Sequence, residues 1–427
     1  MILEEYLTII NRKIKAGIQV FLCPACMETV IVAKMLINEY HIKPTGFCDN
    51  DIRKKGKNIN SIVGLKILSF DDAVKEKEAV FFVVSPHNSA EIIGKLVNEL
   101  NVSKERIINY QPVEKREICH LICQDFFISN KVFSFCCMKN HPTYNHNLLS
   151  LNETISSLYN LRNNIINYVE PIPDNCSNCY NTKSRYIYKS RKLTSVNFSF
   201  VGWCNYKCQY CSAHRPELKN YKSGFVLEEY LIEMEKRGML NDIFSVLYAV
   251  GEPTLNEKRF SLYEYCGERK YFMDVFSNCS VFDQSLFDLA HKSPVIIRKS
   301  FDAGTPETYA KIKGVNCYYK MLDNVRCYLE APFLALNPKY LFVPGVNDNE
   351  TDINGFVKMC EQMKVDFVTP VFSIMGDEFE QSEHAQKMFK LLVDELAKRN
   401  IFTAGIDNLF DKTENNLYTK SFGNTVR

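Results

Sequence analysis

Three cysteines with an uneven spacing stand out in the segment FVGWCNYKCQYCSAHRP. Cys204, Cys208 and Cys211 form the pattern Cys-x3-Cys-x2-Cys. A four-iron cluster normally takes four cysteine thiolates, so three thiolates leave one iron open to an outside ligand. An open coordination position distinguishes catalytic metal sites from structural ones. Structural zinc is the weaker alternative, because such sites usually show two close cysteine pairs, which this spacing lacks.

A second group of cysteines lies upstream and predicts another metal site. Nine of the 17 cysteines fall between Cys119 and Cys211, a clustering typical of thiolate ligation rather than of disulfides in a large reduced chain. The predicted ligands are Cys176, Cys179, one of Cys119 and Cys123, and one of Cys136 and Cys137, with Cys123 and Cys137 preferred. An iron-sulfur cluster and a structural zinc ion both fit such a set.

The bulk composition limits the partners of the chain. Its 427 residues are 46% hydrophobic and carry a net charge of +2, which indicates a globular protein without the basic field that nucleic acids attract. The first residues place acids where a signal peptide needs bases, and the longest apolar run, residues 79–85, is too short to cross a bilayer. We therefore expect a cytoplasmic protein that binds neither nucleic acid nor membrane.

The elements that must position the cysteines follow from the apolar patterns. Strand-like runs alternate with helical patterns from VNFSFV to DFVTPVF, giving six strand–helix units. A closed eight-unit barrel takes about 250 residues, so the shorter segment predicts an incomplete (βα)6 TIM-like barrel with its site at the carboxyl ends of the strands. The predicted division is a Rossmann-like parallel-sheet domain (1–110), a cysteine-rich auxiliary-cluster segment (111–190), the partial barrel (191–375) and a C-terminal helix and tail (376–427).

Several strand ends of the predicted barrel carry polar motifs in a fixed order. The second strand ends in YAVGEPTL, the fourth in KSFDAGTPETYAKIKG and the fifth in LFVPGVND. Together with the cysteines they resemble the radical S-adenosylmethionine (SAM) superfamily over about residues 193–374. The resemblance implies that SAM binds the open iron and that one electron breaks its sulfonium bond. The resulting 5'-deoxyadenosyl radical then takes hydrogen from a substrate.

The resemblance also assigns roles to single residues. Tyr210 and Val343 border the adenine of SAM, Glu252 binds its ammonium, and Gly251 allows close approach of the backbone. Ser277 and Asn278 provide a further polar contact, while Ser300 and Asp302 face the ribose and the methionine end. No catalytic side chain is assigned. The expected partners are a cytosolic one-electron reductant of the flavodoxin or ferredoxin type and a substrate that is a sugar, a nucleotide sugar or a peptide.

The flanking regions give less specific predictions. The upstream cysteines resemble the SPASM or twitch auxiliary-cluster modules of the same superfamily. The first domain resembles small Rossmann-like domains of glycan-biosynthesis proteins, and it lacks the G-x-G-x-x-G that dinucleotide binding requires, so we expect it to recognise a partner or substrate. Its Cys23 and Cys26 are more simply packing residues than a redox-active dithiol. The alternative for the whole chain is a non-catalytic iron-sulfur or zinc-binding redox sensor or scaffold.

Overall fold

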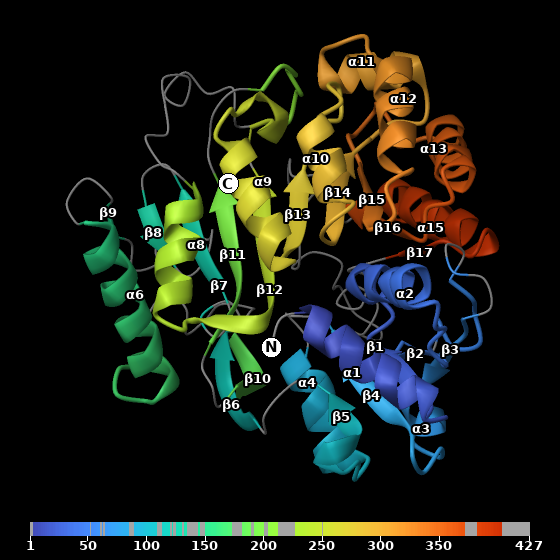
Figure 1. Ribbon diagram of the computed structural model, residues 1–427. Helices are drawn as coiled ribbons and strands as arrows, with labels where there is room; N and C mark the ends of the chain where they lie inside the picture. The colour runs from blue at the N-terminus through green and yellow to red at the C-terminus, as the bar shows by residue number, and fades with distance from the viewer. Residues whose placement is uncertain are drawn as a thin grey trace.

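The computed structural model describes most of the chain, and all structural statements refer to that part. The described residues are 3–51, 53–59, 62, 65–84, 89–108, 113–119, 122, 125–129, 132–134, 144–145, 150–172, 182–188, 192–199, 204–211, 227–249, 251–371 and 382–403. Two parallel sheets with their helices make up this part of the molecule (Figure 1).

The N-terminal domain is a five-stranded parallel sheet in the order β3-β2-β1-β4-β5. Its strands are β1 Val20–Cys23, β2 Gly46–Asp49, β3 Ile67–Ser69, β4 Val80–Val83 and β5 Ile107–Ile108. Its helices are α1 Leu3–Lys15, α2 Met27–Tyr40, α3 Phe70–Ala73 and α4 Ser89–Gly94, followed by a π-helical turn Lys95–Glu99 and a 3-10 turn Lys104–Arg106. The apolar runs QVFL and AVFFVV form the neighbouring strands β1 and β4.

The thiols of this domain behave as packing groups. Cys23 and Cys48 are fully buried, and burial raises the pKa of Cys23 and of Cys26 well above the ordinary thiol value. Asp49, at the end of β2, accepts hydrogen bonds from the backbone of Ala25 (3.0 Å) and from Lys54 Nζ (3.0 Å). These contacts hold the loop after β1 in place and favour the packing interpretation.

The second sheet is the predicted barrel, and it is open. It has ten strands in the order β17-β16-β15-β14-β13-β12-β11-β7-β8-β9, parallel from β17 to β7, and its two edges do not meet. The strands are β7 Asp125–Ser129, β8 Val132–Ser134, β9 Tyr144–Asn145, β11 Leu193–Ser199, β12 Leu240–Ala249, β13 Phe272–Phe276, β14 Val295–Ser300, β15 Leu334–Leu341, β16 Phe367–Val371 and β17 Phe402–Thr403. The predicted α/β fold with an incomplete barrel is therefore confirmed.

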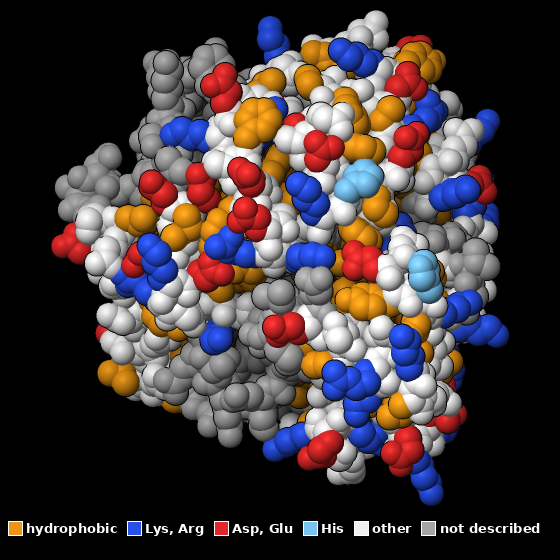
Figure 2. Space-filling model, in the orientation of Figure 1, with side chains coloured by type: hydrophobic (Ala, Val, Ile, Leu, Met, Phe, Trp, Pro, Cys, Tyr) orange, Lys and Arg blue, Asp and Glu red, His pale blue; other side chains and the backbone are white. Residues whose placement is uncertain are grey.

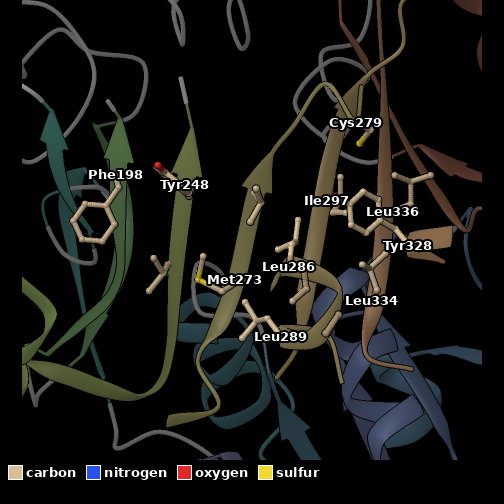
Figure 3. Close-up of a cluster of buried hydrophobic side chains, with 14 of the residues drawn as sticks. Phe198, Tyr248, Met273, Cys279, Leu286, Leu289, Ile297, Tyr328, Leu334 and Leu336 are labelled. Carbon is tan, nitrogen blue, oxygen red and sulfur yellow. The ribbon is translucent and has the colours of Figure 1, made fainter. Parts of the chain in front are cut away.

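Helices cover the outer face of this sheet (Figure 1). They are α6 Leu151–Ile166, α8 Leu227–Lys236, α9 Arg259–Arg269, α10 Gln284–Leu289, α11 Pro306–Lys313, α12 Tyr318–Tyr328, α13 Glu350–Gln362 and α15 Glu383–Lys398, with a 3-10 turn at Pro253–Leu255. Alternate strand residues such as Met273, Ile297 and Leu336 meet helix residues such as Leu289 and Tyr328 in the largest hydrophobic core (Figure 3). Burial of this apolar layer holds the strands in register.

The segment before β11 contributes strands to the barrel sheet, which its irregular sequence did not predict. Strand β7 pairs in parallel with β11, and Ser195 on β11 donates a hydrogen bond to Asp125 on β7. Phe126 and Ile128 alternate into the outer core. A strand of five residues gives too short a pattern to stand out in a segment rich in cysteine, asparagine and proline. The strands β6 Val113–Cys119 and β10 Thr182–Tyr188 form a separate antiparallel pair.

The N-terminal domain closes the lower end of the barrel sheet. One hydrophobic core joins its helices α1 and α2 to barrel side chains at the start of several strands, namely Phe272, Ile296, Phe333, Ala335, Phe367 and Phe402. Helix α2 packs against β15, and Figure 1 shows it below the barrel strands, whose arrowheads point away from it. The carboxyl ends of the strands, where the polar motifs lie, are therefore at the opposite end from this interface.

The surface is mixed in charge. On the face shown in Figure 2, Lys and Arg side chains are interspersed with Asp and Glu, as the small net charge predicts. Among the helices of the described residues, none combines the length and the hydropathy that a bilayer-spanning segment needs.

Candidate active site

The cysteine loop, residues 204–211, lies against the carboxyl-terminal end of helix α11. Lys207 N donates to the carbonyl oxygen of Lys313 (3.0 Å), and Gln209 N donates to that of Ile312 (3.1 Å). The last carbonyls of a helix have no partner within the helix, so they are free to accept these bonds. Gly314 ends the helix with φ of 68°, and a Cβ there would lie 2.9 Å from the Lys207 carbonyl oxygen. The helix end and its glycine thus fix the backbone on both sides of Cys208.

The three loop thiols are partly exposed. Burial raises the pKa of Cys204 to about 11, and two N–H groups oppose this rise: Tyr206 N (3.5 Å) and Asn278 Nδ2 (3.8 Å) both donate to Cys204 Sγ. Burial also raises the pKa of Cys208, against the attraction of the Lys313 ammonium. N–H bonds to sulfur of this kind stabilise thiolates and tune the potentials of iron-sulfur clusters.

The donor set therefore fits a thiolate-ligated cluster. Within the described ranges, no three His, Cys, Asp or Glu side chains converge on a site for a single ion. A four-iron cluster takes its thiolates on separate irons, and metal binding itself deprotonates the thiols.

Glu252 is the centre of a network at the ends of β12 and β13. It is 3% exposed and follows Gly251, whose φ of 74° is the left-handed region that favours glycine. Its Oε1 accepts from Ser277 Oγ (2.8 Å) and Thr254 Oγ1 (2.9 Å), and its Oε2 accepts from Asn278 N (2.6 Å). Burial raises the pKa of Glu252, although these hydrogen bonds oppose the rise. Among the described residues no cationic side chain bonds to this carboxylate.

Asn278 joins the Glu252 network to the cysteine loop. Its backbone N–H binds Glu252, while its side-chain Nδ2 donates to Asn205 Oδ1 (2.7 Å) as well as to Cys204 Sγ. Asn205 in turn donates to Ser280 Oγ (2.7 Å). The structure thus brings together four residues predicted for the site, namely Gly251, Glu252, Ser277 and Asn278, beside Cys204.

Asp302 is buried and bonded within the chain. Its side chain has no exposed surface, and its carboxylate accepts bonds from Lys313 Nζ, from the Tyr210 hydroxyl and from Leu341 N (2.8 Å). Burial alone would raise the pKa of Asp302, but the Lys313 ammonium holds it below the ordinary value. Both oxygens of Asp302 therefore bind the chain and position Tyr210 and β15, and its contact with SAM remains a prediction. The sequence did not single out Lys313 as the internal partner of this carboxylate.

Tyr210 and Val343 lie together, as predicted. Both belong to a small apolar cluster with Ile312, Leu341, Val346 and Val371. Asn347, which the sequence analysis missed, fixes this region: its Nδ2 donates to the carbonyls of Asp302 (2.7 Å) and Leu341 (2.7 Å), and its Oδ1 accepts from Val343 N (2.6 Å). Ser300 is half-buried at the end of β14.

The predicted ligands of the second metal site lie outside the described residues. These are Cys123, Cys137, Cys176 and Cys179, together with the alternative Cys136. For Cys119 the structure describes only its place at the end of strand β6. The second cluster therefore remains a prediction.

Comparison with known proteins agrees with this geometry. Residues 198–360 match the model of the radical SAM superfamily. The matched segment, which contains the cysteine loop and the strand ends around it, is therefore similar to the radical SAM superfamily. A curated relative is GTP 3',8-cyclase of Clostridium acetobutylicum, 23% identical over 180 residues, which are 41% of this chain and 55% of the relative. The chain thus matches about half the length of that relative.

Two solved structures are also similar at low identity. Streptococcus suis SuiB has a TM-score of 0.41 and 16% identity, covering 64% of this chain and 61% of SuiB. The structure of anSMEcpe with bound AdoMet has a TM-score of 0.41 and 19% identity, covering 50% of this chain and 64% of anSMEcpe.

Proposed function

We propose that this chain reductively cleaves SAM at a four-iron cluster held by Cys204, Cys208 and Cys211, and uses the resulting radical to take hydrogen from a substrate. The observation that carries the proposal is the Glu252 network, which ends in an N–H bond to Cys204 at the carboxyl edge of the sheet. A cationic, adenine-bearing cofactor requires a carboxylate, an apolar wall and a three-thiol loop at one edge of the sheet.

Different residues of the chain bind different parts of SAM. Glu252, which has no cation of its own, accepts the ammonium of the methionine end in a charge-assisted bond. Tyr210 and Val343 pack against the adenine, and Ser300 hydrogen-bonds the ribose. The cluster, when bound, supplies the electron that breaks the sulfonium bond, while the protein orients SAM and excludes water from the radical.

Loss of SAM cleavage in a loop mutant tests this function. Changing Cys204, Cys208 and Cys211 together to Ala should abolish formation of 5'-deoxyadenosine by anaerobically reduced protein. The loop is partly exposed at the sheet edge, so the far-ultraviolet circular dichroism should be retained. Cys327→Ala, which changes an exposed cysteine on α12, should keep full cleavage. Cleavage that survives in the triple mutant would reject this loop as the site of the reaction. Cleavage that is absent from iron-loaded wild-type protein would leave the non-catalytic metal-binding role.

A polar substrate fits the barrel interior best. Several strand residues that alternate with the outer core are polar and paired across strands: Arg298 with Asp274 (Nε–Oδ1 2.7 Å) and Thr369 with Asn337 (3.0 Å). Closed barrels are instead filled by branched apolar side chains. This lining supports a sugar, nucleotide or polar peptide substrate. The electron comes from a one-electron donor of the flavodoxin or ferredoxin type.

A second cluster on Cys123, Cys137, Cys176 and Cys179 completes the proposal. It would accept an electron from the substrate radical or hold the segment 111–190 in shape. Iron and sulfide analysis of reconstituted protein should give about eight of each per chain, and about four after Cys176 and Cys179 are both changed to Ala. The double mutant should still form 5'-deoxyadenosine without product. About four irons together with zinc in the wild-type protein would contradict the redox role.

A further inference from the structure

Lys299 is a buried ammonium for which the proposed function gives no role. It lies near the end of β14, is 1% exposed, and shares the outer face of the strand with Ile297 and Phe301. Its Nζ donates to the carbonyl oxygen of Ser300 (2.9 Å) and approaches the Tyr309 hydroxyl (3.4 Å). Neutral acceptors therefore hold the ammonium in one position.

Three aromatic rings surround the same ammonium. Its Nζ lies 4.9 Å from the ring centroid of Phe301, 5.3 Å from that of Tyr309 and 6.0 Å from that of Tyr206. Rings at this distance attract a cation through their negative faces. Tyr206 belongs to the cysteine loop, midway between Cys204 and Cys208, and its hydroxyl bonds to that of Tyr309 (2.8 Å). The ammonium is thus packed directly behind the loop.

The charge of Lys299 is not balanced by a salt bridge. The nearby carboxylate of Asp302 is bonded to Lys313, and no described carboxylate lies within ion-pair distance of Lys299. Burial and repulsion by Lys313 lower the pKa of Lys299 to about 8, whereas Asp302 and the thiols of Cys208 and Cys279 oppose this shift. A cation that is buried without a counter-ion is costly, so its retention indicates that an anion belongs beside it.

We propose that Lys299 is the counter-charge of the cluster held by the cysteine loop and sets its reduction potential. This inference rests on the proposed function. Thiolate ligation makes the bound cluster anionic, and the one electron taken from the external donor adds a further negative charge, with no bond made or broken. A fixed cation behind the loop stabilises the reduced state more than the oxidised state, and so raises the potential. Lys299 is thus a positioning residue, because it acts through the electrostatic field that its charge produces at the cysteine loop.

The midpoint potential of the cluster tests the role of Lys299. Lys299→Met removes the charge while keeping a long apolar chain, and Lys299→Arg keeps the charge. Anaerobically reconstituted proteins would be titrated while the reduced cluster is followed by electron paramagnetic resonance. We expect a more negative midpoint in K299M, a midpoint near wild type in K299R, and no change in the control Lys311→Met, an exposed position on α11. The K299M deficit in 5'-deoxyadenosine formation should be larger with dithionite than with the stronger reductant titanium(III) citrate.

Iron content separates the possible outcomes. A K299M protein with wild-type iron content and an unchanged midpoint would reject the role of Lys299 alone. A wild-type protein that takes up no iron would reject the proposed function and this role with it. If K299M does not hold iron, Lys299→Gln replaces it in the titration, because the glutamine amide can still donate to the Ser300 carbonyl. The midpoint potential of K299Q should then also be more negative than that of wild type.

Discussion

Two buried carboxylates at the same sheet edge have opposite electrostatic environments. Glu252, between β12 and β13, is bound only by neutral donors, and burial raises its pKa. Asp302, at the end of β14, is bound by the ammonium of Lys313, which holds its pKa down despite burial. A carboxylate that already has its cation is structural, whereas one that lacks a cation is prepared to receive one from a ligand. The same residue chemistry therefore serves packing at Asp302 and, in the function that we propose, binding at Glu252.

Among the changes that test this comparison, removing the Lys313 ammonium beside Asp302 should have the largest effect. Lys313→Met would leave the Asp302 carboxylate buried and unpaired, which typically costs about 3–5 kcal/mol. Urea unfolding of the metal-free protein should show this loss, and the double mutant with Asp302→Asn should recover part of it. Lys311→Met on the same helix should be neutral. A K313M protein as stable as wild type would show that the pair does not hold the region together.

Removing the charge of Glu252 should change binding more than stability. Glu252→Gln keeps the shape but loses the charge-assisted bond to the SAM ammonium, worth about 1.5–3 kcal/mol, so SAM affinity should fall roughly ten-fold or more. Equilibrium binding of SAM to reconstituted protein measures this. Glu257→Gln, an exposed position in the same loop, is the control. Unchanged affinity in E252Q would make Glu252 as structural as Asp302.

Alanine substitutions at Gly314 and Gly345 test how tightly the end of helix α11 holds the cysteine loop. Gly314 and Gly345 both have left-handed φ values, of 68° and 69°, so an Ala at either position costs about 1–2 kcal/mol. Only at Gly314 would the added Cβ also press on the Lys207 carbonyl, since nothing lies within 4 Å at Gly345. Iron retention should therefore fall in G314A but not in G345A. Equal iron content in the two would show that the helix end does not fix the loop.

The smallest effect is expected for Asn278, which joins the Glu252 network to the cysteine loop. Asn278→Ala removes the long N–H bond to Cys204 together with the side-chain bonds to Asn205 and from Ser280 N, but keeps the backbone bond to Glu252. We expect normal iron content, a slightly more negative cluster potential and nearly unchanged SAM affinity. A large loss of SAM affinity would mean that the Asn278 side chain contacts SAM itself.

The sequence predicted the elements of the site better than their connections. The alternation of strands and helices and the need for a glycine at position 251 follow from local patterns, since alternation and glycine act over a few positions. The pairing of Asp302 with Lys313 was not predicted, because a lysine in an amphipathic helix is normally solvated and only the tertiary fold buries this one. Asn347 was missed for a similar reason: beside its local bonds to Val343 and Leu341, it reaches the carbonyl of Asp302, which only the folded sheet brings close.

The shared core beneath the barrel has a consequence for the synthesis of this protein. The N-terminal sheet leaves the ribosome first, yet its helix α2 is covered by side chains made much later, from Phe272 to Phe402. Domains fold as units in order of synthesis, and transiently exposed apolar surface promotes aggregation. The face of the first domain that packs against the barrel must therefore stay uncovered while most of the barrel is translated, so the nascent chain exposes apolar surface until β17 has been made.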